Sequence, residues 1–209
     1  MVALQGTLLG ATEPRVDDSA AIERIDLGAG SWIDLARAWL HGADTLLDAL
    51  VDCVDWRHGR RWMYDRMVDD PRLSRWYRRE HELPHDAFGQ IRAALTEHYD
   101  VELGGFGLNY YRDGSDSVAF HRDRELRRLD NTLIAIVTLG ATRPFLVRPL
   151  GGGRSRDLRP GSGDLLVMGG RCQLAWEHGV PKVVHAGPRI SLTLRWAKNH
   201  GRSPTPPSG

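Results

Sequence analysis

The second half of the chain is built from short β-type runs separated by turn-forming residues, and this alternation limits the fold more than any other feature. After Gly104, aliphatic, β-branched and aromatic residues gather in segments that Gly, Pro and Asp divide. These segments are residues 107–111, 117–120, 132–139, 144–147, 164–168 and 189–196. Strands at this spacing are typical of an antiparallel sandwich or jelly roll.

The first half carries a helical periodicity instead. Apolar residues recur three and four apart from Leu46 to Val54, and again from Phe88 to Tyr99. This spacing predicts two amphipathic helices, and Ser31 and Asp44 are plausible N-caps. Residues 1 to about 30 mix Gly, Pro and charge, which predicts an irregular lead-in. The proline-rich residues 199–209 predict a disordered tail.

Charge and cysteine content exclude several classes of protein. With 28 Lys and Arg against 27 Asp and Glu, the chain has no strong overall positive charge that would indicate nucleic-acid binding. Its cysteines, Cys53 and Cys172, give neither a disulfide framework nor a zinc-ligand spacing, which fits a reducing interior. No apolar run approaches the roughly 20 residues that span a bilayer. We therefore expect a soluble cytoplasmic protein without membrane contact, and a monomer.

One short motif, His121-Arg122-Asp123, has the composition of a metal site. Both side chains follow a predicted strand, where alternate residues project to one face, so both can address one ion. A second such motif, His98-Tyr99-Asp100, ends a predicted helix, where residues two apart point to different faces. Two imidazoles and one carboxylate, with other positions open, are what a non-haem Fe(II) oxygenase uses to hold iron.

Two histidines compete to be the third ligand. His178 follows the apolar run of residues 173–176, whereas His185 lies just before Arg189, where the chain should be turning. In a jelly roll the third ligand should lie on a late strand beside the metal. This placement favours His178 over His185, which we interpret as a loop residue.

Two arginines, Arg189 and Arg195, lie six residues apart on the last predicted strand and therefore face the same side, with Ser191 and Thr193 between them. The residues that alternate with them are apolar and predict core packing. Arginines buried on one face need acidic partners. A solvated face would also accommodate them, but a dicarboxylate ligand such as a keto acid better compensates the free-energy cost of burying two positive charges.

Arginine and aromatic residues crowd between Trp56 and Arg79. Arginine for phosphate and aromatic faces for base stacking are the components of single-strand binding. The alternative is that Trp62, Trp76 and Tyr77 pack the lead-in against the sandwich. Acidic residues such as Asp65 reduce the positive electrostatic field of this segment, so its binding to nucleic acid should be modest and salt-sensitive.

The chain from Gly107 to Trp196 resembles the AlkB family of Fe(II)/2-oxoglutarate dioxygenases, in particular its nucleic-acid dealkylating branch. The resemblance is carried by NYYRDG at residues 109–114, HRDRE at 121–125, GDLLVM at 163–168, WEHGVPK at 176–182 and PRISLTLR at 188–195. Less specifically, Met63-Tyr64 and Pro71-Arg72-Leu73 look like the nucleotide-recognition lid of this branch.

The resemblance implies a role for each matching residue. The iron ligands would be His121, Asp123 and His178. The keto-acid end of 2-oxoglutarate would be held by Asn109 and Arg195, and its distal carboxylate by Tyr111 and Arg189. The residues implied to contact substrate are Met63, Tyr64, Arg72, Trp76, Tyr77 and Glu125.

The chain also departs from the family pattern in places. Ser191, included among the cosubstrate-binding candidates, stands where the relative has an amide side chain. The spacing from Asn109 to His121 is longer than in the bacterial prototype, and that from His178 to Arg189 is shorter. Turns can absorb these offsets, but they weaken inference about substrate identity.

The implied fold is α+β: a double-stranded β-helix, or jelly roll, with N-terminal helices and a nucleotide-recognition lid. Residues 1–100 would supply the extension, helices and lid, and residues 101–198 the catalytic core, as one domain. The implied activity is oxidative dealkylation of N-alkylated bases in DNA or RNA, with Fe(II), 2-oxoglutarate and O₂, releasing formaldehyde, succinate and CO₂. Hydroxylation of a peptide or small metabolite is the alternative, and a non-catalytic ligand-binding jelly roll is a third hypothesis.

Overall fold

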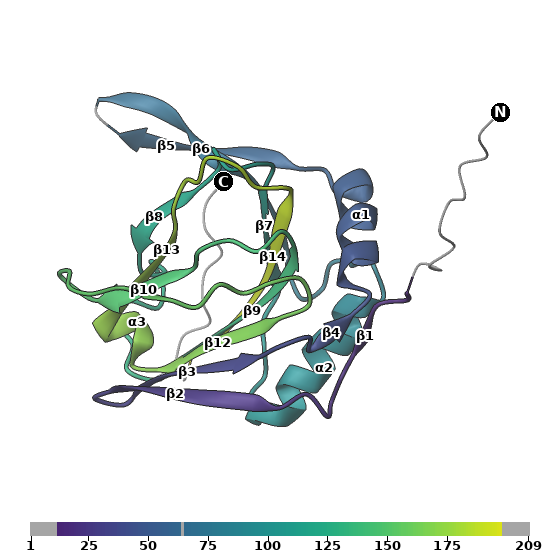
Figure 1. The fold of residues 1–209 in the computed structure, drawn as a ribbon, viewed down its shortest axis with the longest axis horizontal. Coiled ribbons are helices and arrows are strands. Elements are labelled where there is room, and N and C mark those ends of the chain that lie inside the picture. The colour runs from purple at the N-terminus through teal and green to yellow at the C-terminus, as the bar shows by residue number, and fades with distance from the viewer. Residues whose placement is uncertain (1–11, 64, 198–209) are drawn as a thin grey trace.

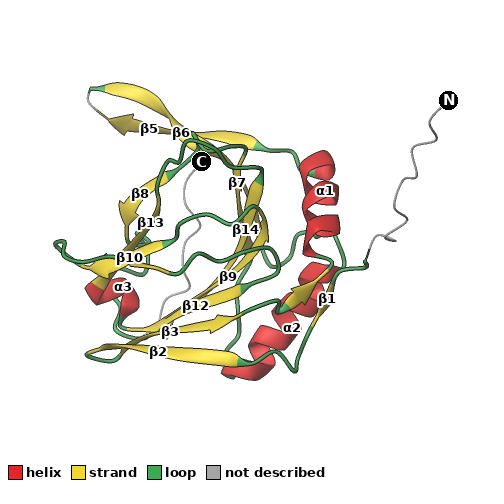
Figure 2. Ribbon diagram, in the orientation of Figure 1, coloured by secondary structure: helices red, strands yellow, loops and turns green. Residues whose placement is uncertain are grey.

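The computed structural model describes residues 12–63 and 65–197, and its main feature is a pair of β-sheets that face each other (Figure 1). The larger sheet has eight strands in the order β2-β3-β12-β9-β14-β7-β6-β5, and the smaller has four in the order β11-β10-β13-β8. A short two-stranded sheet, β1-β4, lies beside them. The helices α1 and α2 lie on the outer side of the large sheet (Figure 2).

The elements have the following bounds. The large sheet contains β2 (Ile22–Gly28), β3 (Ser31–Ala36), β5 (Arg57–Met63), β6 (Arg66–Tyr77), β7 (Phe106–Tyr111), β9 (Thr132–Gly140), β12 (Leu165–Gly170) and β14 (Arg189–Ala197). The small sheet contains β8 (Val118–His121), β10 (Leu146–Pro149), β11 (Arg156–Asp157) and β13 (Trp176–Val180). The remaining elements are β1 (Arg15–Val16), β4 (Leu40–His41), α1 (Ala43–Cys53), α2 (Ala87–Tyr99) and α3 (Cys172–Ala175).

Strand β9 shows how the two faces of the large sheet divide. Its neighbours are β12 and β14, both antiparallel, and nearly all of its residues are buried. Leu133 and Val137 belong to a core on the helix side, whereas Ile134 and Ile136 belong to a second core between the sheets. Because alternate residues of a strand project to opposite faces, the large sheet is buried on both sides at β9.

The two expected helices are present, and they cover the outer face of the large sheet. Leu46 and Leu50 of α1, with Phe88 and Ile91 of α2, are fully buried against it. Burying a side chain of this kind stabilises the fold by about 1.5–3 kcal/mol. The inner face is left for the second core and for the polar residues described below.

The N-terminal expectations were partly wrong. The expected irregular lead-in contains β2, which pairs with β3 along its length. Ser31 is not an N-cap but the first residue of β3, and Asp44 lies in the first turn of α1, after the left-handed Gly42. Strand β2 is an edge strand with an exposed face, so its sequence is polar and lacks a clear apolar alternation. The expected tail at residues 199–209 lies outside the described residues.

Strands β5 and β6 form a hairpin that extends beyond the large sheet (Figure 1). Strand β6 pairs with β7 only from Leu73 to Tyr77, whereas its pairing with β5 continues to the hairpin end. The outer half of the hairpin is therefore held by its own strand pairing. Within the described ranges, no helix has both the length and the apolar character needed to cross a membrane.

Candidate metal centre and anion pocket

Two histidines and an aspartate meet at the inner side of the small sheet. His121 ends β8, Asp123 follows it in the loop, and His178 lies on β13 directly opposite His121 in the strand register. Their candidate ligand atoms all lie within 4.8 Å of one another. The structure therefore brings together His121, Asp123 and His178 as expected. His185 lies in the loop between β13 and β14, also as expected, and His98-Tyr99-Asp100 spans the end of α2.

Asp123 and His178 are held in the charge states that metal binding requires. Burial alone would raise the pKa of the Asp123 carboxyl, but the charge of Arg195 and the hydrogen bond from His121 outweigh it and hold that pKa well below its usual range. Burial, reinforced by His121, lowers the pKa of His178 to about 3. Neutral imidazole and ionised carboxylate are the ligand forms.

A metal ion fits this group. Nδ1 of His178 is buried and has no hydrogen-bond partner among the described residues, and such an atom is costly unless something binds it. Two imidazoles and a carboxylate with open positions suit Fe(II). The described residues thus provide three candidate ligands for one ion.

Gln173, which the sequence analysis missed, orients the aspartate. It lies in α3, between β12 and β13, and its Oε1 accepts a hydrogen bond of 2.8 Å from the backbone N–H of Asp123. Gln173 is itself buried. Its position just before the strand of His178 was the only available sequence signal, because nothing in the sequence shows that α3 packs under the loop of Asp123.

A buried arginine lies deeper on the inner face of the large sheet. Arg189 begins β14 and is fully buried. Its guanidinium donates hydrogen bonds to Ser191 Oγ at 2.6 Å and Thr138 Oγ1 at 3.2 Å, and its Cζ lies 5.3 Å from the centre of the Tyr111 ring. Burial lowers the pKa of Arg189 to about 10, against a smaller opposing effect of Tyr111.

This arginine is suited to an anionic ligand. No carboxylate of the described residues forms an ion pair with Arg189, and its buried Nε has no hydrogen-bond partner there. A buried charge left unpaired is costly, so a carboxylate ligand would stabilise it. Thr138 was missed because its neighbours on β9 are apolar and the sequence does not show which face the hydroxyl takes.

The other expected cosubstrate residues lie on the same face. Tyr111 pairs with Arg189 and Asn109 with Ser191 in the register of β7 and β14. Arg195, on the same strand, donates from Nε to Asp123 Oδ2 at 2.5 Å. Asn109, Tyr111, Arg189, Ser191 and Arg195 therefore share one side of two adjacent strands, so the expectation that Arg189 and Arg195 face the same side is confirmed.

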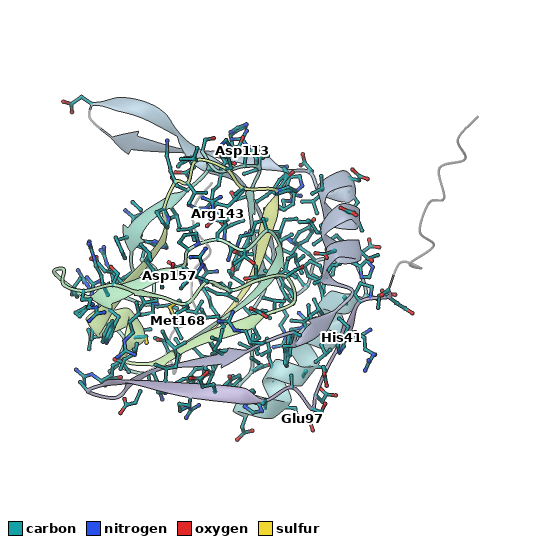
Figure 3. The ribbon with its side chains drawn as sticks, viewed as in Figure 1. His41, Glu97, Asp113, Arg143, Asp157 and Met168 are labelled. Carbon is teal, nitrogen blue, oxygen red and sulfur yellow. The ribbon has the colours of Figure 1, made fainter. Side chains whose placement is uncertain are left out.

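A second buried arginine, Arg143, lies in the interior of the molecule (Figure 3) and binds the loops around it. It donates hydrogen bonds to the backbone carbonyls of Asp113 and Asp116 in the β7–β8 loop and of Pro181 after β13. Burial lowers its pKa. Arg143 thus fixes two loops in one arrangement, a role the sequence analysis did not identify.

The expected substrate contacts are only partly brought together. Trp76 of β6 faces inward, opposite Gly107, with its ring centre 5.6 Å from the Arg195 guanidinium carbon. A Cβ at residue 107 would lie 2.9 Å from the Trp76 ring, which explains the glycine there. Arg72 also points to the site, where its Nε donates to Asn109 Oδ1 at 2.8 Å.

Tyr77 corrects the sequence analysis. It follows Trp76 on the strand, so it projects to the other face and packs against the helix-side core. The structure therefore does not bring it to the site. Glu125 is exposed in the loop after Asp123. Tyr64 and the side chain of Met63, both expected contacts, lie outside the described part of the structure.

Comparison with known proteins places this site in a family. The model of the 2OG-Fe(II) oxygenase superfamily matches residues 53–195. The chain belongs to this superfamily, and it is an Fe(II)- and 2-oxoglutarate-dependent dioxygenase whose cosubstrates are 2-oxoglutarate and O₂.

Within the superfamily, the related sequences include AlkB homologues. The chain is 30% identical over 216 residues to the mouse alpha-ketoglutarate-dependent dioxygenase alkB homolog 3, covering 88% of this chain and 73% of that protein. It is 25% identical over 236 residues to the DNA oxidative demethylase ALKBH2 of Arabidopsis thaliana, covering 90% and 74%. The AlkB-like resemblance seen in the sequence is therefore confirmed.

Solved structures confirm the jelly-roll fold. OsALKBH1 has a TM-score of 0.59 at 15% identity, over 83% of this chain and 99% of that one. A prolyl hydroxylase from Trichoplax adhaerens has a TM-score of 0.61 at 12% identity, over 79% and 83%. At these identities the likeness concerns the fold alone.

Proposed function

We propose that this dioxygenase removes N-linked alkyl groups from bases of DNA or RNA. A methylated base would yield formaldehyde and the repaired base, while 2-oxoglutarate would be converted to succinate and CO₂. The observation that carries the proposal is that Arg72 and Trp76, from the arginine- and aromatic-rich segment, project into the iron and anion site from β6.

The inner face of β7 and β14 would hold 2-oxoglutarate. Arg189 is the buried cation for the distal carboxylate, with Tyr111 beside it and Ser191 and Thr138 fixing its guanidinium. Asn109 and Arg195 would bind the keto-acid end nearer His121, Asp123 and His178. A planar guanidinium suits this task because it binds carboxylate through two parallel hydrogen bonds.

The residues of the chain would position the reactants and exclude water. When bound, Fe(II) supplies the oxidative chemistry together with 2-oxoglutarate and O₂. His121, Asp123 and His178 would hold the ion, and Gln173 keeps Asp123 in place. The apolar side chains of the second core lie on the same inner face, and they would help to exclude water from the bound reactants.

The hairpin gives the nucleic-acid part of the proposal its physical basis. An enzyme acting on a ring nitrogen must take the base single-stranded or extruded from the helix. Arginines contact phosphates and an inward aromatic ring such as Trp76 can stack on a base. The AlkB relatives include proteins described as DNA oxidative demethylases, which supports nucleic acid over other substrates.

The test is formaldehyde release from a single-stranded oligonucleotide carrying one N-methylated base, with Fe(II) and 2-oxoglutarate. We expect stoichiometric formaldehyde and succinate, and neither from Asp123→Asn. The unmethylated oligonucleotide is the substrate control. Succinate formation that methylated oligonucleotides never stimulate, but that a peptide or small metabolite does, would replace this proposal by the hydroxylase alternative.

A further inference from the structure

Arg72 occupies the point where the hairpin leaves the large sheet. Strand β6 pairs with β7 from Leu73 onward, so Arg72 is the first hairpin residue beyond that pairing. Its Nε donates to Asn109 Oδ1 at 2.8 Å, across a sequence separation of 37 residues. The preceding Pro71 carbonyl accepts a 2.7 Å hydrogen bond from Ser117 N–H. Two consecutive hairpin residues are thereby tied to the site and to its β7–β8 loop.

The hydrogen bond determines which end of the Asn109 amide remains available. An asparagine side chain has one carbonyl oxygen and one NH₂ group with two donors. Because Arg72 occupies Oδ1, the Nδ2 donors remain for a ligand. Asn109 lies opposite Ser191 on the inner face, so a carboxylate or keto oxygen there would meet a donor.

The positive charges of Arg72 and Arg189 also favour an anionic ligand. Arg195 is paired with Asp123, but neither Arg72 nor Arg189 forms an ion pair with a carboxylate whose side chain the structure describes. Arg72 is half-buried, so screening by solvent reduces its field only in part. A ligand with two negative charges would therefore be attracted by Arg72 as well as by Arg189.

We propose that Arg72 is a positioning residue for 2-oxoglutarate, acting through the amide of Asn109. This inference rests on the proposed assignment of Asn109 to the keto-acid end. It gives the hairpin residue two effects: it would lie beside the nucleic acid, and it would set the geometry of the cosubstrate site. If the hairpin were displaced from the site, the protein would then bind both 2-oxoglutarate and the nucleic acid more weakly.

The test is a double-mutant cycle read by binding alone. Calorimetry measures the affinity of the Mn(II)-loaded protein for 2-oxoglutarate without nucleic acid, for wild type, Arg72→Ala, Asn109→Ala and the double variant. We expect Arg72→Ala to weaken binding about tenfold, the scale of one hydrogen bond to a charged group. In the Asn109→Ala background the same change should cost less than about twofold.

Two further variants separate geometry from charge and from damage to the strand. Arg72→Lys keeps the charge but loses the planar donor, so it should recover only part of the affinity. Arg75→Ala is the matched control, because Arg75 lies on the same strand but contacts Asp55 and Tyr77 away from the site. Its affinity for 2-oxoglutarate should equal that of wild type.

Either of two results overturns the inference: unchanged 2-oxoglutarate affinity in Arg72→Ala, or an equal loss in the presence and absence of Asn109. Affinity for Mn(II) should stay constant in all variants, which shows that the fold is intact. The calorimetry contains no nucleic acid. Its result can therefore be interpreted even if the dealkylation assay fails.

Discussion

Arg195 of the last strand donates from Nε to Asp123 Oδ2 at 2.5 Å, across 72 residues of sequence. This contact joins the two sheets at the metal centre, because Arg195 belongs to β14 of the large sheet and Asp123 follows β8 of the small one. It keeps the aspartate ionised in a buried position. The aspartate therefore has two partners, the proposed metal and a cation that would also contact the cosubstrate.

Replacing Asp123, the proposed carboxylate ligand, should abolish metal binding and turnover. In Asp123→Asn the charge is lost but the shape is kept, so Arg195 loses its ion pair while packing changes little. Outer-shell substitutions alone cost about 10–100-fold in metal affinity, so the loss here should exceed about a hundredfold. Mn(II) calorimetry and succinate formation measure it.

Asp100→Asn is the matched control for this change. Asp100 belongs to the second His-x-Asp motif and has a left-handed backbone with φ 50°, which Asn tolerates. It should retain wild-type metal affinity and turnover. Full turnover in Asp123→Asn would contradict the assignment of the metal centre.

Replacing Arg189 should remove cosubstrate binding while sparing the metal. Arg189→Met keeps much of the buried volume but removes the cation and its bidentate fork. Each hydrogen bond to a charged group contributes about 1.5–3 kcal/mol, so a bidentate pair implies a loss of about two to four orders of magnitude in 2-oxoglutarate affinity. Calorimetry on the Mn(II)-loaded protein would show this, with Mn(II) affinity unchanged; normal 2-oxoglutarate affinity would show that the distal carboxylate binds elsewhere.

Gln173 should influence the metal although it is not a ligand. Gln173→Leu leaves the buried N–H of Asp123 without its acceptor, which costs about 1–3 kcal/mol and loosens the loop that presents the carboxylate. We expect an affinity for Mn(II) lower by about ten- to a hundredfold and a lower Tm. Gln90→Leu, at an exposed position of α2, is the control. Equal Mn(II) affinities in the two variants would reduce Gln173 to a packing role.

The sequence sufficed to predict the parts of the site that lie close together along a strand. His121 is the last residue of β8, and Asp123 lies two residues further on, in the loop, where its carboxylate still meets the His121 imidazole. Arg189 and Arg195 share a face because they lie an even number of residues apart on β14. Strand alternation is a local property, so it can be predicted from the sequence without knowledge of neighbouring strands.

Contacts between distant segments were not predictable in this way. Gln173 and Thr138 reach the site through packing of α3 and register of β9, and neither leaves a local pattern. The prediction for Tyr77 was wrong for a related reason. Tyr77 was grouped with Trp76 by composition, whereas consecutive strand residues face opposite sides. Strand β2 was missed because an exposed edge strand needs few apolar residues.

Cysteine reactivity offers a test of the packing around α3. Cys172 is buried and donates to the Trp32 carbonyl, and burial raises the pKa of its thiol to about 11, whereas Cys53 is exposed. Thiolate is the reactive form, so at pH 8 a thiol reagent should label Cys53 quickly and Cys172 only when α3 opens. Because Cys172 precedes Gln173, its labelling rate would report opening of the segment that holds Asp123.

The raised pKa also predicts how stability depends on pH. Between the ordinary thiol pKa of 9.0 and the folded value of about 11, the unfolded chain loses the Cys172 proton and the folded chain keeps it. The free energy of unfolding should therefore fall as pH rises through this window, by at most about 1.4 kcal/mol per pH unit from this group. Denaturant unfolding from pH 8 to 10.5 measures it as a difference in slope between wild type and Cys172→Ala, with Cys53→Ala as control. If all three proteins lose stability in parallel over this range, the Cys172 thiol ionises as readily in the folded protein as in the unfolded chain, and α3 is not packed as the structure shows.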